Sequence, residues 1–239
     1  MPTVAMDELL KIATSWGLHL NQRQIEQFAR YSVELRAWNT RVNLTSITDE
    51  REIVVRHFLD SLRCALSWGD APSCLIDVGS GAGFPGLPLK ILRPELRVTL
   101  VESVGKKAAF LQHIVAALDL HDVTVVTARA EVVGRDPQHR EQYDVVTARA
   151  VAELATLAEY CLPLCRIGGR VLAPKGSNVD DEIARAHVAI ARLGGHLVSI
   201  EPVALPGVEP RTLIVIAKIA PTPAAYPRAV GIPAKRPIR

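Results

Sequence analysis

The sequence predicts an α/β protein built on a seven-stranded, mostly parallel sheet. From Cys74 onward, short β-rich apolar runs alternate with stretches whose apolar residues recur at helical spacing. Apolar strands separated by helices are typical of a parallel sheet that helices cover on both faces. The expected strands are residues 74–79, 97–102, 123–127, 143–148, 170–174, 196–201 and 212–218.

The region before the first strand is predicted to be helical. Apolar residues recur at helical spacing from Leu9 to Trp16. Asn21 followed by Gln24 resembles a capping box that opens a second helix. Asp49 begins a third helix, with inward-facing apolar residues after it. We therefore expect an N-terminal helical extension.

The chain divides into three predicted parts. Residues 1–70 form the helical extension, residues 71–220 the sheet domain, and residues 221–239 a basic tail with five prolines and no acidic residue. The loop between the last two strands is too short for a helix, so this pair is predicted to be antiparallel.

Composition limits the possible class of protein. With 239 residues, 49% of them apolar, the chain has an ordinary globular composition. It has no apolar run of the roughly 18 residues that span a bilayer, and no recognisable secretory signal. Its four cysteines form no CxxC pair and no metal-ligand spacing, which favours reduced thiols, a cytoplasmic protein and no metal. The net charge of +3 permits an RNA partner, and nothing indicates an obligate oligomer.

The stretch LIDVGSGAGFPGLPL, residues 75–89, follows the first predicted strand directly. It holds four glycines within eight residues. Glycines permit unusual dihedral angles and let the backbone approach a ligand closely. In open α/β sheets, ligands bind outside the carboxyl ends of the strands, where this turn lies. We therefore expect a cofactor there.

Two ligands fit this turn. The spacing GxGxxG at residues 81–86, with Glu102 beyond it, matches a dinucleotide-binding dehydrogenase, although this motif alone is weak. The overlapping spacing DxGxGxG, which starts at Asp77, resembles motif I of the class I S-adenosylmethionine (SAM) methyltransferases. Asp77, the expected antiparallel pair and the helical extension favour SAM.

Polar residues follow several other predicted strands. Glu102 ends the second strand, where a carboxylate can bind ribose hydroxyls, and Ser103 comes next. Glu131 follows the third strand and has an alternative role as a helix N-terminal acid that the dipole stabilises. Arg149 and Lys175 follow the fourth and fifth strands. Each is a candidate for substrate positioning or for an ordinary ion pair.

The sequence lacks motifs of two other methyltransferase classes, which narrows the class of reaction. The sequence TARA at residues 147–150 replaces the Asn/Asp-Pro-Pro-aromatic run common in methyltransferases that act on exocyclic amines of bases. Carbon-5 methylation needs a cysteine nucleophile, and the nearest, Cys161, lies in an apolar helix. A ring nitrogen such as guanine N7 has no proton to lose and needs only in-line alignment with the methyl group.

Several motifs in order now identify a family. They are WNxxxNLTSI (38–47), RHFLDS (56–61), IDVGSGAGFPGLPL (76–89), ESVGKKAAFL (102–111), ARAE (128–131), ARA (148–150), APKG (173–176) and YPR…GIPAKRPI (226–238). Across nearly the whole chain, the sequence resembles the bacterial 16S rRNA guanine-N7 methyltransferases called RsmG or GidB.

The resemblance implies a Rossmann-like class I fold and SAM-dependent methylation of N7 of guanine 527, in the 530 loop of 16S rRNA in the 30S subunit. Together, the motif and the resemblance predict cofactor binding by Asp77, Gly79, Gly81, Gly83, Phe84, Glu102, Ser103, Val104, Ala130, Glu131 and Arg149. Arg149 and Lys175 are expected to position the substrate, without a general base. The candidate RNA contacts are Arg129, Arg56, His57, Arg228, Lys235 and Arg236.

Other interpretations stay open at this point. A dehydrogenase would bind a nicotinamide cofactor at the same glycines. A ribosome-assembly factor would bind rRNA and use SAM structurally, without turnover. Arg56 and Asp60 are spaced to form an ion pair along one helix. The basic tail is either a solvated terminus or a phosphate contact.

Overall fold

A computed structural model describes residues 3–69, 72–177 and 179–239. It contains one seven-stranded sheet in the order β3-β2-β1-β4-β5-β7-β6. The strands are β1 (Cys74–Val78), β2 (Arg97–Val101), β3 (Val123–Val126), β4 (Tyr143–Thr147), β5 (Cys165–Lys175), β6 (Gly195–Val203) and β7 (Arg211–Lys218). Strands β1 to β5 pair in parallel, and β7 pairs antiparallel with both β5 and β6. The predicted fold class is confirmed.

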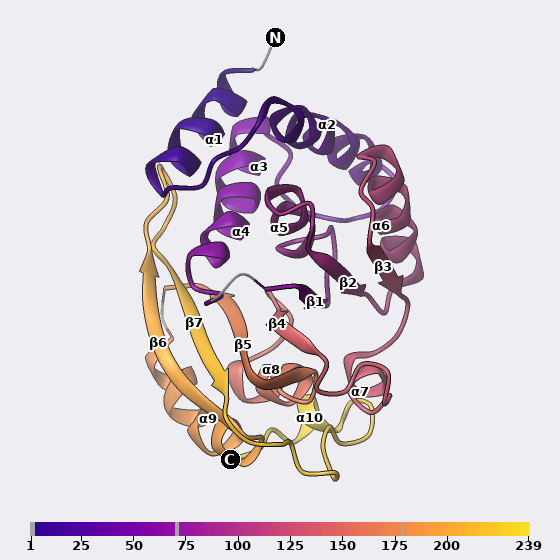
Figure 1. Ribbon diagram of the computed structural model, residues 1–239, viewed down its shortest axis with the longest axis vertical. Coiled ribbons are helices and arrows are strands. Elements are labelled where there is room, and N and C mark those ends of the chain that lie inside the picture. The colour runs from indigo at the N-terminus through magenta and orange to yellow at the C-terminus, as the bar shows by residue number, and fades with distance from the viewer. Residues whose placement is uncertain (1–2, 70–71, 178) are drawn as a thin grey trace.

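Helices cover both faces of the sheet (Figure 1). They are α1 (Val4–Ser15), α2 (Gln22–Asn39), α3 (Glu50–Ile53), a π-helix (Val54–Leu59), α4 (Asp60–Leu62), a 3-10 turn (Arg63–Leu66), α5 (Gly86–Leu92), α6 (Gly105–Ala117), α7 (Ala130–Val133), α8 (Leu154–Cys161), α9 (Asp180–Arg192) and α10 (Ile232–Lys235). One hydrophobic core joins α1–α6 to one face, and a second joins α7–α9 to the other. No helix among the described residues is long and apolar enough to span a membrane.

The N-terminal helices begin where the sequence predicts. The Asn21 side chain accepts from the backbone N–H of Gln24, and the Gln24 side chain accepts from that of Asn21, which completes the capping box. Asp49 caps the next helix through the N–H of Glu52. That helix passes through a π-helical segment at Val54–Leu59, which the apolar spacing did not predict. Such segments occur often at functional sites, and this one carries His57.

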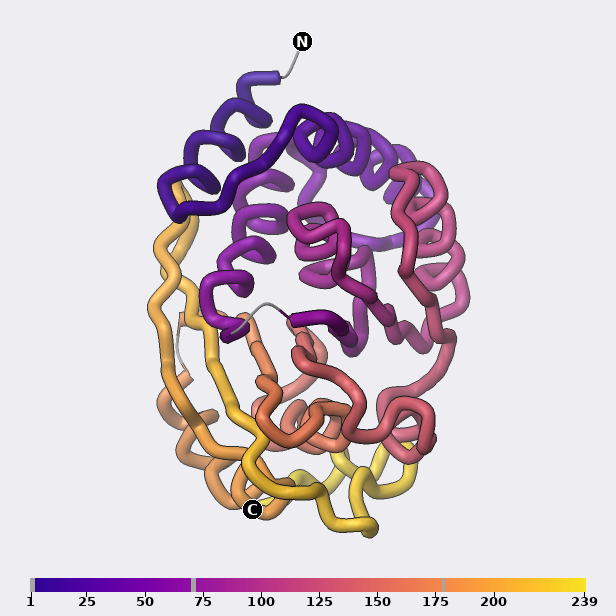
Figure 2. The backbone as a smooth tube through the Cα atoms, in the orientation of Figure 1, coloured from indigo at the N-terminus to yellow at the C-terminus, as the bar shows by residue number. Residues whose placement is uncertain are grey.

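The C-terminal segment, residues 221–239, packs along the side of the molecule that carries α7 and α8 (Figure 2). Ile238 is 4% exposed within the second core, and the Pro233 carbonyl accepts a hydrogen bond from Thr156. The segment is therefore packed against the domain at several points, while Lys235 and Arg236 stay exposed. Its apolar residues and backbone carbonyls find partners that lie far away in the sequence.

Candidate active site

The glycine turn lies where the carboxyl ends of β1 and β2 meet. The N–H groups of Gly79 and Ser80 both donate to the Val101 carbonyl, at 2.8 and 3.0 Å. Gly81 and Gly83 adopt φ angles of +58° and +94°, which disfavour any residue with a Cβ atom. The parallel register of the two strands therefore places a tight turn at this edge of the sheet.

The two sides of this turn differ. A Cβ atom at Gly83 would overlap the Tyr31 hydroxyl and Leu87, so this side is packed. At Gly81, the nearest atom to such a Cβ is the Gly79 carbonyl oxygen, 3.8 Å away. The turn is therefore closed against the N-terminal helices and open at Gly81, where a ligand can approach the backbone.

Glu102 lies at the end of β2 and is 6% exposed. One carboxylate oxygen accepts from the N–H of Gly81 at 3.0 Å, and the other accepts from that of Val104 at 2.7 Å. The neighbouring Ser103 and Val104 are exposed. This arrangement fixes a negative charge beside the open part of the turn.

Asp77 is fully buried beneath the turn. Its carboxylate accepts from the Thr147 hydroxyl at 2.9 Å and from the Gly86 N–H at 3.2 Å. Burial raises the pKa of Asp77 to about 6, against the lowering effect of these hydrogen bonds. Asp77, which was predicted to bind the cofactor, thus links β1 to β4 and to the start of α5 through its side-chain hydrogen bonds.

Arg149 lies after β4 and is held on several sides. Its Nη1 donates to Asp60 Oδ2 at 2.9 Å and to the Arg56 carbonyl at 3.0 Å. The guanidinium carbon lies 5.0 Å from the centre of the Phe84 ring, within cation–π range. Arg149, a predicted substrate-positioning residue, therefore links the end of β4 to the π-helix.

His57 stacks on Phe84, with ring centroids 4.5 Å apart. Burial and, after it, the charge of Arg149 lower the pKa of His57 to about 3, so the ring is neutral. Its Nδ1 lies 3.2 Å from Nη2 of Arg149, and its Nε2 lies 2.9 Å from the Thr45 hydroxyl. Nδ1 also lies 3.1 Å from the Arg56 carbonyl oxygen, so the ring is held at Nδ1 by this carbonyl and by Arg149, and at Nε2 by the Thr45 hydroxyl.

Lys175 and Glu131 make internal contacts. The Lys175 ammonium donates to the Ala152 carbonyl at 2.7 Å and to Glu182 at 2.6 Å. Glu131 lies in the first turn of α7, as its alternative role requires, and its carboxylate accepts from Gly231. Ala130 is half-buried beside it.

The predicted RNA-binding residues fall into three groups. Arg129, Lys235 and Arg236 are exposed. Arg56 is half-buried, with Nε 3.5 Å from Glu52. His57 and Arg228 are occupied by internal contacts, the first with Phe84 and the second with the buried Glu159.

Sequence reasoning missed three residues of this site. An ion pair of Asp60 with Arg56 along one helix was one of the alternatives, but the Asp60 carboxylate pairs with Arg149 and Arg211, each at 2.9 Å. Tyr31 donates to the Ala82 carbonyl in the glycine turn at 2.5 Å. These partners lie 51 or more residues apart, so no local pattern indicates them.

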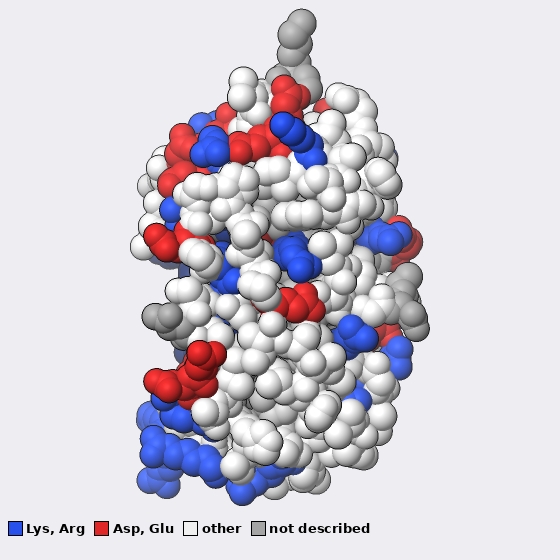
Figure 3. All heavy atoms as spheres, turned by 90° about the vertical axis from the view of Figure 1, so that its left-hand side faces the viewer, with Lys and Arg blue, Asp and Glu red and all other residues white. Residues whose placement is uncertain are grey.

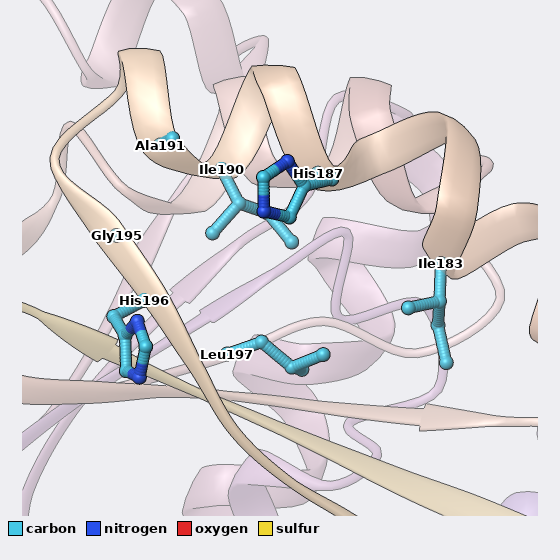
Figure 4. Close-up of a pocket in the computed structure, with 7 residues that line it drawn as sticks. All are labelled: Ile183, His187, Ile190, Ala191, Gly195, His196 and Leu197. Atoms are coloured by element: carbon cyan, nitrogen blue, oxygen red, sulfur yellow. The ribbon is translucent and has the colours of Figure 1, made fainter.

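A separate cavity of about 270 Å³ lies between α9 and β6. Figure 4 shows His187 and Ile190 of α9 facing it, with His196 and Leu197 on the strand below. It lies at the edge of the sheet formed by β6, away from the glycine turn, so we do not assign the reaction to it.

Solved structures show the class of fold. A putative SAM-dependent methyltransferase from Methanococcus maripaludis aligns with a TM-score of 0.53 and 15% identity, over 69% of this chain and 85% of that one. A 16S rRNA (adenine(1408)-N(1))-methyltransferase mutant from Catenulisporales acidiphilia aligns with a TM-score of 0.54 and 14% identity, over 69% and 92%. The fold is that of the class I SAM-dependent methyltransferases.

Sequence comparison then gives the family. Residues 24–207 match the family model GidB, rRNA small subunit methyltransferase G. The protein named ribosomal RNA small subunit methyltransferase G from Roseiflexus castenholzii is 86% identical over 98% of this chain and all of its own length. The one from Chloroflexus aggregans is 58% identical, over 96% and 97%. The chain belongs to the rRNA small subunit methyltransferase G family.

The site residues fit SAM. The open side of the turn at Gly81 leaves room for a ligand against the backbone. The nearly buried Glu102 carboxylate supplies an acceptor for hydroxyl groups and a negative charge for a cation. The exposed side chain of Val104 offers an apolar surface for a ring. Among the residues that the structure describes, no cluster of three or more His, Cys, Asp or Glu is placed to hold a metal.

Proposed function

We propose that this protein methylates N7 of guanine 527 in the 530 loop of 16S rRNA and uses SAM as the methyl donor. The carrying observation is the arrangement at the carboxyl edge of the sheet. A fixed carboxylate and an open glycine turn lie there, near an arginine and a neutral histidine that hold each other in place. Membership in the methyltransferase G family supports the same reaction.

The titratable groups of this edge favour an N7 target. Asp77 is buried with both carboxylate oxygens hydrogen-bonded, and Lys175 is bound to Glu182. Burial raises the pKa of Cys161 far above its usual range, which opposes a thiolate nucleophile. N7 carries a lone pair and no hydrogen, so this target requires no proton acceptor.

The chain's own residues supply position and charge. Bound SAM would supply an electrophilic methyl group, to which N7 would bond through its lone pair as the sulfur–methyl bond breaks, with no proton to be transferred. Glu102, the open backbone at Gly81 and the exposed Val104 would hold the cofactor. Arg149, fixed by Asp60 and Phe84, orients the guanine, and Lys175 holds the loop at Ala152. Most of the rate then comes from alignment.

The RNA-binding surface is expected around exposed basic residues. Arg129 lies beside the proposed site, directly before α7, and Lys235 and Arg236 lie on the C-terminal segment. A separate group of Lys and Arg lies at the lower end of the face that carries β6 and α9 (Figure 3), on the side of the molecule opposite α7 in Figure 1. Phosphate contacts of this kind weaken as salt rises.

The test is methyl transfer from labelled SAM to 30S subunits that lack the modification, followed by mapping of the labelled nucleotide. Label at guanine 527 N7 supports the whole proposal. Label at another position overturns the target. A protein that binds SAM tightly but transfers no methyl group to 30S subunits or assembly intermediates would instead be an assembly factor.

A further inference from the structure

Two buried carboxylates face the C-terminal segment. Glu159 of α8 is fully buried, and both its oxygens bind the Arg228 guanidinium, at distances between 2.6 and 3.1 Å. Glu131 of α7 is 4% exposed, and one oxygen accepts from the Gly231 N–H at 2.9 Å. Buried carboxylates are costly unless they are paired or hydrogen-bonded. Arg228 and Gly231, three residues apart in the segment, each supply the partner of one such carboxylate, the first on α8 and the second on α7.

Two further arginines hold the same segment in place. Arg135 donates to the Pro227 carbonyl at 2.7 Å, and Arg140 donates to the carbonyls of Tyr226 and Thr222 at 2.8 and 2.7 Å. Both arginines lie in the chain that follows α7. The segment is therefore bound from Thr222 to Gly231 to the region after β3.

Helix α7 depends on such outside contacts. It has only four residues, and a single helical turn is not stable alone in water. Its first residues, Ala130 and Glu131, are the ones expected to meet the adenine of SAM. The Glu131 carboxylate accepts from the Gly231 N–H, which ties this turn to the C-terminal segment.

We propose that the C-terminal segment is a positioning element of the adenine end of the cofactor site, and that the Glu131–Gly231 hydrogen bond transmits this effect. The inference rests on the proposed function, because it requires SAM beside α7. It assigns Glu131 the role of a positioning residue whose carboxylate holds the turn from behind. Arg228 fixes the segment to α8 so that Gly231 stays in reach.

The experiment compares SAM binding by calorimetry for three variants of α7. Glu131→Ala removes the acceptor and is expected to weaken SAM binding roughly tenfold. Glu131→Gln keeps an acceptor oxygen and is expected to stay near the wild type. Val132→Ala changes a side chain of the same helix that is 52% exposed, and serves as the matched control. Steady-state kinetics should show the loss in KM for SAM and not in kcat.

Hydrogen exchange of the wild-type protein gives a second test, which does not depend on whether a variant folds. Because coupling is reciprocal, added SAM should slow exchange of the Gly231 amide as well as of the amides in the glycine turn. Protection of the turn with no change from 226 to 233 would overturn the inference, as would unchanged SAM affinity in Glu131→Ala. A wild-type protein with no affinity for SAM would overturn the proposed function instead.

Discussion

Asp60 binds Arg149 across 89 residues of sequence, with 2.9 Å between Oδ2 and Nη1. The same carboxylate lies 2.9 Å from Nε of Arg211 on β7, and it is 3% exposed. One residue of the N-terminal helices thus connects the end of β4 to the start of β7. Removing one member of a buried ion pair leaves an uncompensated charge, which makes Asp60 a sensitive position.

Asp60→Asn is expected to lower the free energy of unfolding by about 3 kcal/mol, because two arginines lose their counter-charge. Methyl transfer should fall with it, since Arg149 loses its anchor. Chemical denaturation and initial-rate assays measure the two effects. The control is Glu52→Gln, which breaks the exposed contact with Arg56 and should cost less than about 1 kcal/mol. Equal losses for the two variants would contradict this role of Asp60.

The variant Arg149→Lys tests whether activity depends on the planar guanidinium group or on the positive charge alone. A lysine keeps the positive charge but cannot lie flat over Phe84 while it also bonds Asp60 and His57. We expect kcat/KM to fall roughly 10- to 100-fold, together with a lower melting temperature from the lost contacts. An active lysine variant would show that charge alone suffices at this position.

The two sides of the glycine turn should respond differently to an added methyl group. Gly83→Ala creates overlap with Tyr31 and Leu87 in addition to backbone strain, and is expected to cost more than about 3 kcal/mol. Gly81→Ala meets mainly the backbone strain, about 1–2 kcal/mol. Its Cβ instead narrows the open side, so SAM affinity should fall more than stability. Denaturation and calorimetry on both variants decide the matter.

His57 should make the stability of the protein depend on pH. Its pKa is about 3 in the fold and about 6.5 in the unfolded chain, so only the unfolded chain takes up a proton between these values. The stabilisation is complete above pH 6.5 and is lost as the pH falls toward 3. Compared with His57→Gln, the wild type should lose about 3 kcal/mol between pH 7 and pH 4.

Two measurements check this prediction. Denaturation of both proteins at each pH cancels the contribution of all other groups. Nuclear magnetic resonance of the His57 ring should show no titration from pH 8 to pH 5, with free imidazole as the reference. A titration near pH 6.5 would contradict the neutral ring.

Local sequence patterns predicted the elements well and the contacts between them poorly. The apolar strands, the capping box at Asn21 and the glycine turn each depend on neighbours within a few residues, so their signals are visible in the chain. The partners of Asp60 and Glu131 depend on how the helices dock on the sheet. The π-helical turn at His57 likewise interrupts a pattern that reads as one continuous helix.

The predicted site shows the same difference. The carboxyl edge of the sheet follows from strand order, and Glu102 was expected there. The internal pairing of Lys175 with Glu182 was only the alternative to a role with substrate. The position of a charged residue at a strand end predicts where its side chain lies. It does not predict whether another side chain of the protein is already paired with that charge.

The stacked rings of Tyr31, Phe84 and His57 join α2, the glycine turn and the π-helix in one column. The Tyr31 and Phe84 rings share a core with the strands below them, so these segments lack a boundary at which one can open alone. We expect their backbone amides to lose protection in a single cooperative step, as one folding unit. The helical extension and the turn it supports would then be gained or lost together.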